Sequence, residues 1–176
     1  MLLSIVVPVY NEEENIANFY KAVTDVMSGL TYDYELIFVD DGSSDSSAMI
    51  LREIAFNDKH VKVLLLARNF GHQTALTCGL DYAHGDAVIT MDGDMQHPPA
   101  LIPELVRLWE SGYDVVRTIR DSTDDASWAK SFTSKYYYKL MNKMADVPIV
   151  EGGSDFRLMN SKALGTLKRF REHGRF

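Results

Sequence analysis

Five short apolar runs, each rich in valine and isoleucine, most constrain what this chain can fold into. They occupy residues 4–9, 34–40, 61–66, 86–92 and 114–119. Their length and continuity are typical of strands that are buried on both faces of a sheet. Stretches with helical spacing separate them, so the expected order is strand and helix in alternation, beginning and ending on a strand. This alternation predicts an α/β fold with a mainly parallel sheet and helices on both faces.

The helical stretches also predict which side chains are buried. Apolar residues recur every three or four positions in each stretch, as on the inner face of an amphipathic helix. The expected core positions are Ile16, Phe19, Val23, Val26 and Leu30, then Met49, Ile50 and Ile54, then Leu76, Leu80 and Ala83, then Leu101, Leu105 and Leu108.

The length and composition fit one soluble domain spanning residues 1–176. The chain has 176 residues, 46% of them hydrophobic, which is enough for a single core. No apolar run approaches the roughly 18 residues that a membrane helix requires. A single cysteine excludes an internal disulfide, and the first residues lack the features of a signal peptide. These features predict a reducing, cytosolic setting.

Charge is distributed unevenly along the chain. The net charge of −7 argues against a general nucleic-acid binder, which needs a basic surface. Residues 1–127 carry a net charge of −13, whereas residues 128–176 carry +6. The basic stretch 130–143 also contains three consecutive tyrosines, a combination that suits a membrane surface. An ordinary solvated helix remains an equal alternative for it.

Polar clusters follow the first and second predicted strands. Residues 10–15, YNEEEN, contain no glycine, so the glycine-rich fingerprint of dinucleotide-binding proteins is absent. By themselves these residues could simply cap an acidic helix start. The adjacent pair Asp40 and Asp41 could begin a turn, but two neighbouring carboxylates at a strand end also call for a donor or cation. The imide N–H of uracil is such a donor.

The most informative cluster follows the fourth strand, in the segment MDGDMQHPP (91–99). Asp92 and Asp94, separated by one glycine, offer two hard oxygen ligands within reach of one cation, and Gln96 could add a third. Mg²⁺ or Mn²⁺ suits such ligands and usually completes its coordination with substrate phosphates and water. A bridging cation would also let an acidic protein hold an anionic diphosphate.

Taken together, these segments resemble the inverting family 2 glycosyltransferases. The resemblance is to the polyprenyl-phosphate branch, which includes dolichol-phosphate mannose synthase and bactoprenol glucosyltransferases. It implies a nucleotide-sugar-binding fold of the GT-A type and transfer of one hexose to a polyprenyl phosphate. The matching stretches are VVPVYNEEENI (6–16), ELIFVDDGSSDSS (35–47), RNFGHQTALTCGLDYAHGD (68–86), VITMDGDMQHPPALIPELV (88–106) and EGGSDFRLMNSKAL (151–164).

The resemblance also implies roles for individual residues on the donor side. The nucleoside would lie against the first strand end, Asp41 would contact the base, and basic side chains would face the phosphates. The nucleotide-binding residues implied in this way are Pro8, Tyr10, Glu12, Asp41, Asp92, Arg120 and Lys130, and the metal-binding residues are Asp92, Asp94 and Gln96.

Three residues are expected to act in catalysis. Asp94 and its metal would stabilise the departing nucleotide, since negative charge develops there. The resemblance places Asp155 near the reacting groups, with Arg157 next to it. A lipid phosphate is largely dianionic at neutral pH, since its second pKa is near ~6, and hardly needs a base. Asp155 is therefore either a general base or a residue that positions groups through Arg157.

Several features stay open at this level. A catalytically silent nucleotide-sugar-binding module and a Mg²⁺-dependent phosphotransferase with Asp92 as nucleophile are the alternative functions. UDP-glucose is preferred over a GDP-sugar only because the stretch 68–81 looks more like the bactoprenol branch. Members of this branch usually continue into membrane helices, so the chain is expected to be truncated and to act at the cytoplasmic face of a membrane. A homo-oligomer is possible.

Overall fold

The computed structural model describes residues 1–119 and 153–169. The chain divides into two compact units, one formed by Met1–Val116 with Asp155–Phe176 and the other by Arg117–Ser154. Of the second unit, the structure describes only 117–119 and 153–154. The architecture below is therefore that of the first unit, together with the two strands that run into the second.

Strands and helices alternate along the chain, as the apolar runs predict. Each of the five runs overlaps a strand, and a further strand and helix follow. The elements are β1 (Leu2–Val9), α1 (Ile16–Ser28), β2 (Asp33–Asp40), α2 (Ser47–Asn57), β3 (Val61–Leu65), α3 (His72–Tyr82), β4 (Ala87–Thr90), the 3₁₀ helix η1 (Pro99–Leu101), α4 (Ile102–Glu110), β5 (Val115–Ile119), β6 (Gly153–Asn160) and α6 (Ser161–Arg169).

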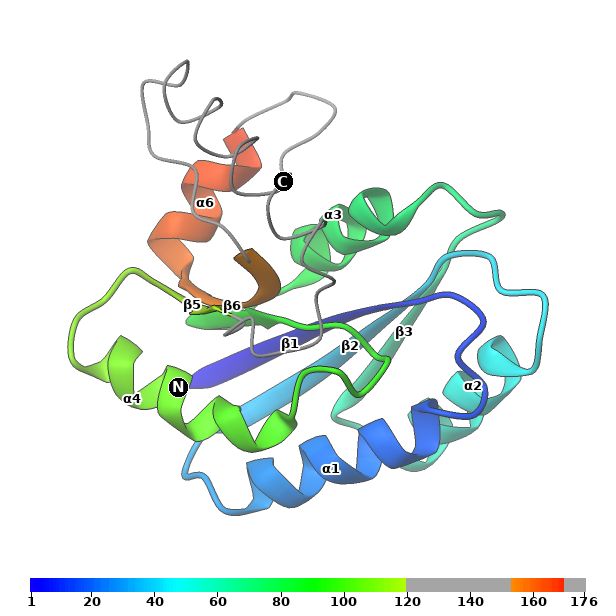
Figure 1. The fold of residues 1–176 in the computed structure, drawn as a ribbon, viewed down its shortest axis with the longest axis horizontal. Coiled ribbons are helices and arrows are strands. Elements are labelled where there is room, and N and C mark those ends of the chain that lie inside the picture. Colours follow the sequence, from blue (N-terminus) through cyan, green and yellow to red (C-terminus); the bar gives the residue numbers. More distant parts are fainter. Residues whose placement is uncertain (120–152, 170–176) are drawn as a thin grey trace, which may run out of the picture. The chain divides into compact units, whose positions relative to one another are not determined.

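The strands form one six-stranded sheet in the order β3-β2-β1-β4-β6-β5. The four strands β3, β2, β1 and β4 pair in parallel, so their carboxyl ends lie at the same edge (Figure 1). β6 runs antiparallel to β4, with Thr90 opposite Arg157. The expectation of a mainly parallel sheet is confirmed, and β6 is its antiparallel exception.

Side chains that alternate along the central strand supply two cores, one on each face of the sheet. Leu3, Ile5 and Val7 point to the face covered by α1, α2 and α4, where Phe19 of α1 and Leu51 of α2 are fully buried. Figure 1 shows α3 and α6 on the opposite face. There Val6, Ile37 and Val39 pack against buried residues of α3 and against Leu164 of α6. The helices thus fix the sheet from both sides.

Two expected core positions are wrong. Met49 is 65% exposed, because α2 turns Ser47 and Leu51 inward and thereby directs Met49 to solvent. Leu101 is 41% exposed, because it ends η1 and the buried face of α4 begins one residue later at Ile102.

Among the residues that the structure describes, no helix combines the length and hydrophobicity needed to span a membrane.

Candidate active site

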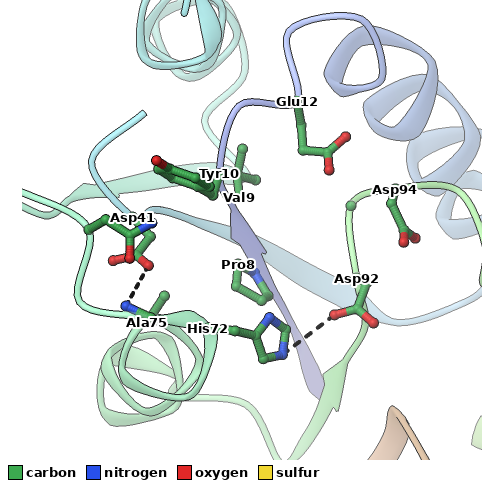
Figure 2. A pocket seen from close by; sticks show the side chains of 12 residues that line it. Pro8, Val9, Tyr10, Glu12, Asp41, His72, Ala75, Asp92 and Asp94 are labelled. Atoms are coloured by element: carbon green, nitrogen blue, oxygen red, sulfur yellow. Dashed lines mark hydrogen bonds and ion pairs between the residues drawn. The ribbon is translucent and has the colours of Figure 1, made fainter. Parts of the chain in front are cut away.

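A cavity of about 370 Å³ opens at the carboxyl ends of β1, β2 and β4. Parallel pairing brings these three strand ends together, which is where open α/β sheets bind ligands. Side chains from the strand ends and from the start of α3 surround the cavity (Figure 2). Its lining consists of Pro8, Val9, Tyr10, Glu12, Asp41, Asn69, Gly71, His72, Ala75, Asp92, Gly93 and Asp94.

Asp41 is buried, with 3% of its surface exposed, and both of its carboxylate oxygens accept hydrogen bonds. Oδ1 accepts from the backbone N–H of Phe70 and Oδ2 from that of Gly71, both at 2.8 Å. Asp41 therefore anchors the turn that leads into α3. Each carboxylate oxygen has a second lone pair, so these bonds leave capacity for a further donor from the cavity.

Gly42 lets this turn approach the end of β2. Its φ is +70°, and a Cβ built there would lie 2.4 Å from the carbonyl carbon of Arg68 and 2.6 Å from the backbone nitrogen of Asn69. Both contacts are with backbone atoms, which cannot rotate away as a side chain can. A residue without Cβ is therefore required at position 42 for this turn to bring Asn69 and Gly71 to the cavity.

Asp92 and Asp94 follow β4 and project toward the cavity with Gly93 between them (Figure 2). The segment turns sharply after Asp94, because Met95 has a positive φ of 62° and the Gln96 backbone N–H donates to Asp94 Oδ1 at 3.0 Å. Gln96 is exposed and is not among the described residues that line the cavity. Two of the three expected metal ligands thus face the cavity.

The electrostatics at Asp92 suit a cation. Burial raises the pKa of Asp92, and the neighbouring carboxylates of Asp94 and Asp155 raise it further, although His72 and His97 oppose them. Within residues 1–119 and 153–169, no group of three His, Cys, Asp or Glu side chains is arranged to hold a metal alone. The donor set fits a metal that takes two carboxylates from the protein and its remaining ligands from substrate and water.

The antiparallel pairing of β6 with β4 brings Asp155 to the same place. Ala87 is opposite Asn160 and Thr90 opposite Arg157, so the same register continued by two residues sets Asp155 across from Asp92. Asp155 pairs with the Arg157 guanidinium through Oδ1. Its other oxygen, Oδ2, lies 3.3 Å from His72 Nε2. The two expected catalytic residues of β6 are therefore paired with each other beside the aspartates of β4.

His72 lines the cavity and was not among the site residues expected from the sequence. It is the first residue of α3, and its Nε2 lies 3.6 Å from Asp92 Oδ1 (Figure 2). The same nitrogen lies close to Asp155. Interaction with Asp155 raises the pKa of His72 despite partial burial, and the same contact lowers the pKa of Asp155. The segment 68–86 contained this residue, but no local signal distinguishes a histidine at a helix start from a surface one.

The remaining expected residues divide by location. Pro8, Tyr10 and Glu12 line the cavity from the end of β1, with Tyr10 46% exposed and available for a planar ligand. Arg120 and Lys130 lie outside the described residues, as does the basic stretch 130–143.

A mainly parallel α/β sheet covered by helices on both faces, with acidic pairs at its strand ends, is an architecture of the GT-A type. The chain belongs to glycosyl transferase family 2, whose family model matches residues 4–167. It is 42% identical over 174 residues to "Uncharacterized glycosyltransferase sll0501" of Synechocystis, covering 99% of this chain and 55% of that one. It is 40% identical over 176 residues to "Bactoprenol glucosyl transferase" of Shigella phage SfV, covering 100% of this chain and 57% of that one. The chain thus spans little more than half the length of these relatives.

Solved structures agree on the fold. The mannosyltransferase PcManGT from Pyrobaculum calidifontis, in complex with GDP-Man and Mn²⁺, matches with a TM-score of 0.63 and 20% identity over 94% of this chain and 46% of that one. Glucosyl-3-phosphoglycerate synthase from Mycobacterium tuberculosis, in complex with Mn²⁺, UDP and phosphoglyceric acid, matches with a TM-score of 0.62 and 23% identity over 92% of this chain and 56% of that one. The expected GT-A fold is confirmed.

Proposed function

We propose that this chain binds the donor in an enzyme that transfers a hexose from a nucleotide diphosphate sugar to a polyprenyl phosphate. The observation that carries the proposal is the meeting of Asp41, Asp92 and Asp94 at one cavity, at the ends of parallel strands. Asp155 of β6 lies beside this cavity, because His72 contacts both Asp92 and Asp155. The 40% identity to a bactoprenol glucosyl transferase supports a polyprenyl phosphate as the acceptor.

The transfer is a single displacement at the anomeric carbon. An oxygen of the lipid phosphate forms the new bond, the bond from the anomeric carbon to the diphosphate breaks, and its electron pair leaves with the nucleoside diphosphate. The configuration of the sugar inverts. A phosphate monoester with a second pKa near ~6 is already ionised at neutral pH, so no proton has to be removed from it.

The chain's own residues would hold the reactants rather than exchange protons with them. Asp155 is bound on one side to Arg157 and on the other to His72, which lower its pKa and leave it an anion. A carboxylate fixed in this way is suited to positioning cationic or hydroxyl groups next to the anomeric carbon. We therefore assign Asp155 and Arg157 to positioning at the reacting centre.

A divalent cation would be held by Asp92 and Asp94. When bound, Mg²⁺ or Mn²⁺ neutralises charge on the departing diphosphate, which is the chemistry that this reaction needs most. Because burial and neighbouring carboxylates raise the pKa of Asp92, a cation there would relieve the repulsion among the acidic residues.

The nucleoside would lie between Pro8, Tyr10 and Glu12 on one side and Asp41 on the other. Asp41 would accept the imide N–H of the base with a lone pair not used by Phe70 or Gly71. Uracil and guanine both present such an N–H, and we propose UDP-glucose as the donor because the chain is similar to a bactoprenol glucosyl transferase over its full length.

Metal-dependent donor binding is the direct test. Thermal stabilisation and calorimetry with UDP and GDP, each with Mn²⁺ or with EDTA, should show UDP binding that Mn²⁺ tightens. Asp94→Asn should remove most of the Mn²⁺ effect, because it deletes a charged ligand. Asp25→Asn is the matched control, since Asp25 is exposed on α1 and pairs only with Lys21 among described residues.

Transfer of radioactive glucose from UDP-glucose to polyprenyl phosphate then separates the alternatives. A silent binding module would bind UDP and transfer nothing. A phosphotransferase would retain a covalent phosphate that Asp92→Asn abolishes. UDP affinity that is equal with and without metal would refute the assignment of Asp92 and Asp94.

We also propose that the enzyme works at the cytoplasmic face of a membrane, where its polyprenyl phosphate would be held. The uneven charge of the chain supports this proposal, because residues 128–176 carry a net charge of +6 whereas residues 1–127 carry −13. Polybasic segments are attracted to anionic lipid by about 1 kcal/mol per charge.

A further inference from the structure

His72 stands between the two acidic groups of the site. Its Nε2 is 3.3 Å from Asp155 Oδ2 and 3.6 Å from Asp92 Oδ1. Each aspartate also has a second basic side chain beside it, because Asp155 pairs with Arg157 and Asp92 lies 3.6 Å from His97 Nδ1. Basic and acidic side chains therefore alternate across the strand ends, with the His72 imidazole in the middle.

The position of this imidazole is fixed by buried backbone rather than by its own surface contacts. The two residues before it, Phe70 and Gly71, donate their N–H groups to Asp41, which is 3% exposed. About two turns further on, Gly79 brings α3 so close to the sheet that a Cβ there would lie 2.3 Å from Val6 Cγ1. The helix that carries His72 is thus held at its start and against its middle.

The His72 imidazole also faces an acidic cavity lining. Four carboxylates line it, those of Glu12, Asp41, Asp92 and Asp94, and among its described lining residues only His72 can carry a positive charge. Without the imidazole, Asp92 and Asp155 would face each other with no donor between them. Like charges in that arrangement repel and would move apart.

We propose that His72 is a positioning residue that ties Asp155 to Asp92, so that the acceptor side of the site stays aligned with the diphosphate side. This inference rests on the glycosyl transfer proposed above. His72 would touch neither the metal nor the sugar. Its loss would therefore displace Asp155 and Arg157 while the donor still binds.

The test uses the longest natural chain that carries this sequence, in lipid nanodiscs, with UDP-glucose, Mn²⁺ and polyprenyl phosphate. His72→Ala should lower kcat by about 10- to 100-fold, the usual effect of misplacing a catalytic group. UDP affinity in Mn²⁺ should stay within about threefold of wild type, as expected when binding contacts are kept. His72→Gln retains an N–H at a similar reach and should recover part of the rate.

A double-mutant cycle tests the route of the effect. If His72 acts through Asp155, His72→Ala combined with Asp155→Asn should be little slower than Asp155→Asn alone. His60→Ala is the matched control, because His60 also pairs with an aspartate, at 2.8 Å from Asp58 Oδ1, but lies away from the cavity lining. It should leave kcat and UDP affinity unchanged.

Each contrary result has a distinct meaning. Wild-type protein that transfers no sugar to polyprenyl phosphate overturns the proposed function and this inference with it. Wild-type transfer that His72→Ala leaves intact overturns the inference alone. A fall in UDP–Mn²⁺ affinity as large as the fall in kcat would make His72 a donor or metal ligand, and additive effects in the cycle would break its link to Asp155.

Discussion

Replacing Gly42 by alanine tests whether the turn over Asp41 builds the donor site. The new Cβ would lie 2.4 Å from the carbonyl carbon of Arg68 and 2.6 Å from the nitrogen of Asn69, so residues 68–71 would have to move away. That movement would stretch the hydrogen bonds from Phe70 and Gly71 to Asp41 and displace the start of α3. We expect Gly42→Ala to weaken UDP binding as well as to destabilise the fold.

The size of the destabilisation follows from two contributions. A non-glycine residue at a φ of +70° costs about 1–2 kcal/mol. Forcing a methyl group against packed neighbours costs a further ~1–3 kcal/mol. Together they amount to about 2–5 kcal/mol. Since each kcal/mol lowers the melting temperature of a domain of this size by about 2–4 °C, a loss of roughly 4–20 °C is expected in a thermal melt. UDP affinity in Mn²⁺ should fall by more than about tenfold, equivalent to ~1.4 kcal/mol.

Gly112→Ala is the control, because Gly112 also has a positive φ, of +106°, but a Cβ there would meet nothing within 4 Å. It lies after α4, away from the cavity lining, so the variant should lose stability through backbone strain alone and keep UDP affinity within about twofold. The reasoning would be refuted if Gly42→Ala bound UDP as wild type does, or if both variants lost affinity equally.

Three further predictions concern stability and transfer. Gly79→Ala should destabilise the fold by about 1–3 kcal/mol, because the new Cβ would lie 2.3 Å from Val6 Cγ1. Gly165→Ala in α6 should instead stabilise the fold by ~0.5–1 kcal/mol, because nothing lies within 4 Å of a Cβ there. Urea unfolding measures both free energies. Burial would raise the pKa of Glu35, but hydrogen bonds to its carboxylate, led by the one from Lys62, lower this pKa below 4.5. The ionised Glu35 therefore stabilises the fold at neutral pH, and this stabilisation is lost as pH falls through the lowered pKa. Lys62→Met should therefore move acid unfolding, followed by circular dichroism, to higher pH. The 176-residue chain should bind UDP with Mn²⁺ yet transfer little glucose to polyprenyl phosphate in detergent-free buffer, and membranes that contain anionic lipid should raise the transfer. Efficient transfer without membranes would remove the membrane from the mechanism.

The donor side of the site was predictable because parallel strands obey a simple geometric rule. Polar residues that follow buried parallel strands must meet at one edge, and Tyr10, Asp41 and Asp92 do so. The apolar runs that locate those strands are local in sequence, so periodicity alone finds them. The alternation of strands and helices likewise predicted that helices cover both faces of the sheet.

The acceptor side was harder because its contacts depend on pairing between distant segments. Nothing local in residues 153–160 indicates that this strand lies antiparallel beside β4, yet that register is what brings Asp155 to Asp92. His72 depends on a different non-local contact, since Asp41 fixes the turn that precedes it. No local sequence pattern links His72, Asp155 and strand β4, because they come from three separate parts of the chain.

Asp41 combines a structural role, which its sequence position does not reveal, with the proposed role of binding the base. Its carboxylate can accept the N–H of a base, and the same oxygens hold Phe70 and Gly71, directly before His72. Because His72 contacts both Asp92 and Asp155, a path of adjacent contacts runs from Asp41 through the start of α3 to these two aspartates. A carboxylate that is also a structural anchor can be buried at little cost, since its hydrogen bonds are made within the protein. In the proposed function, the donor would therefore bind to a site whose acceptor side is already aligned.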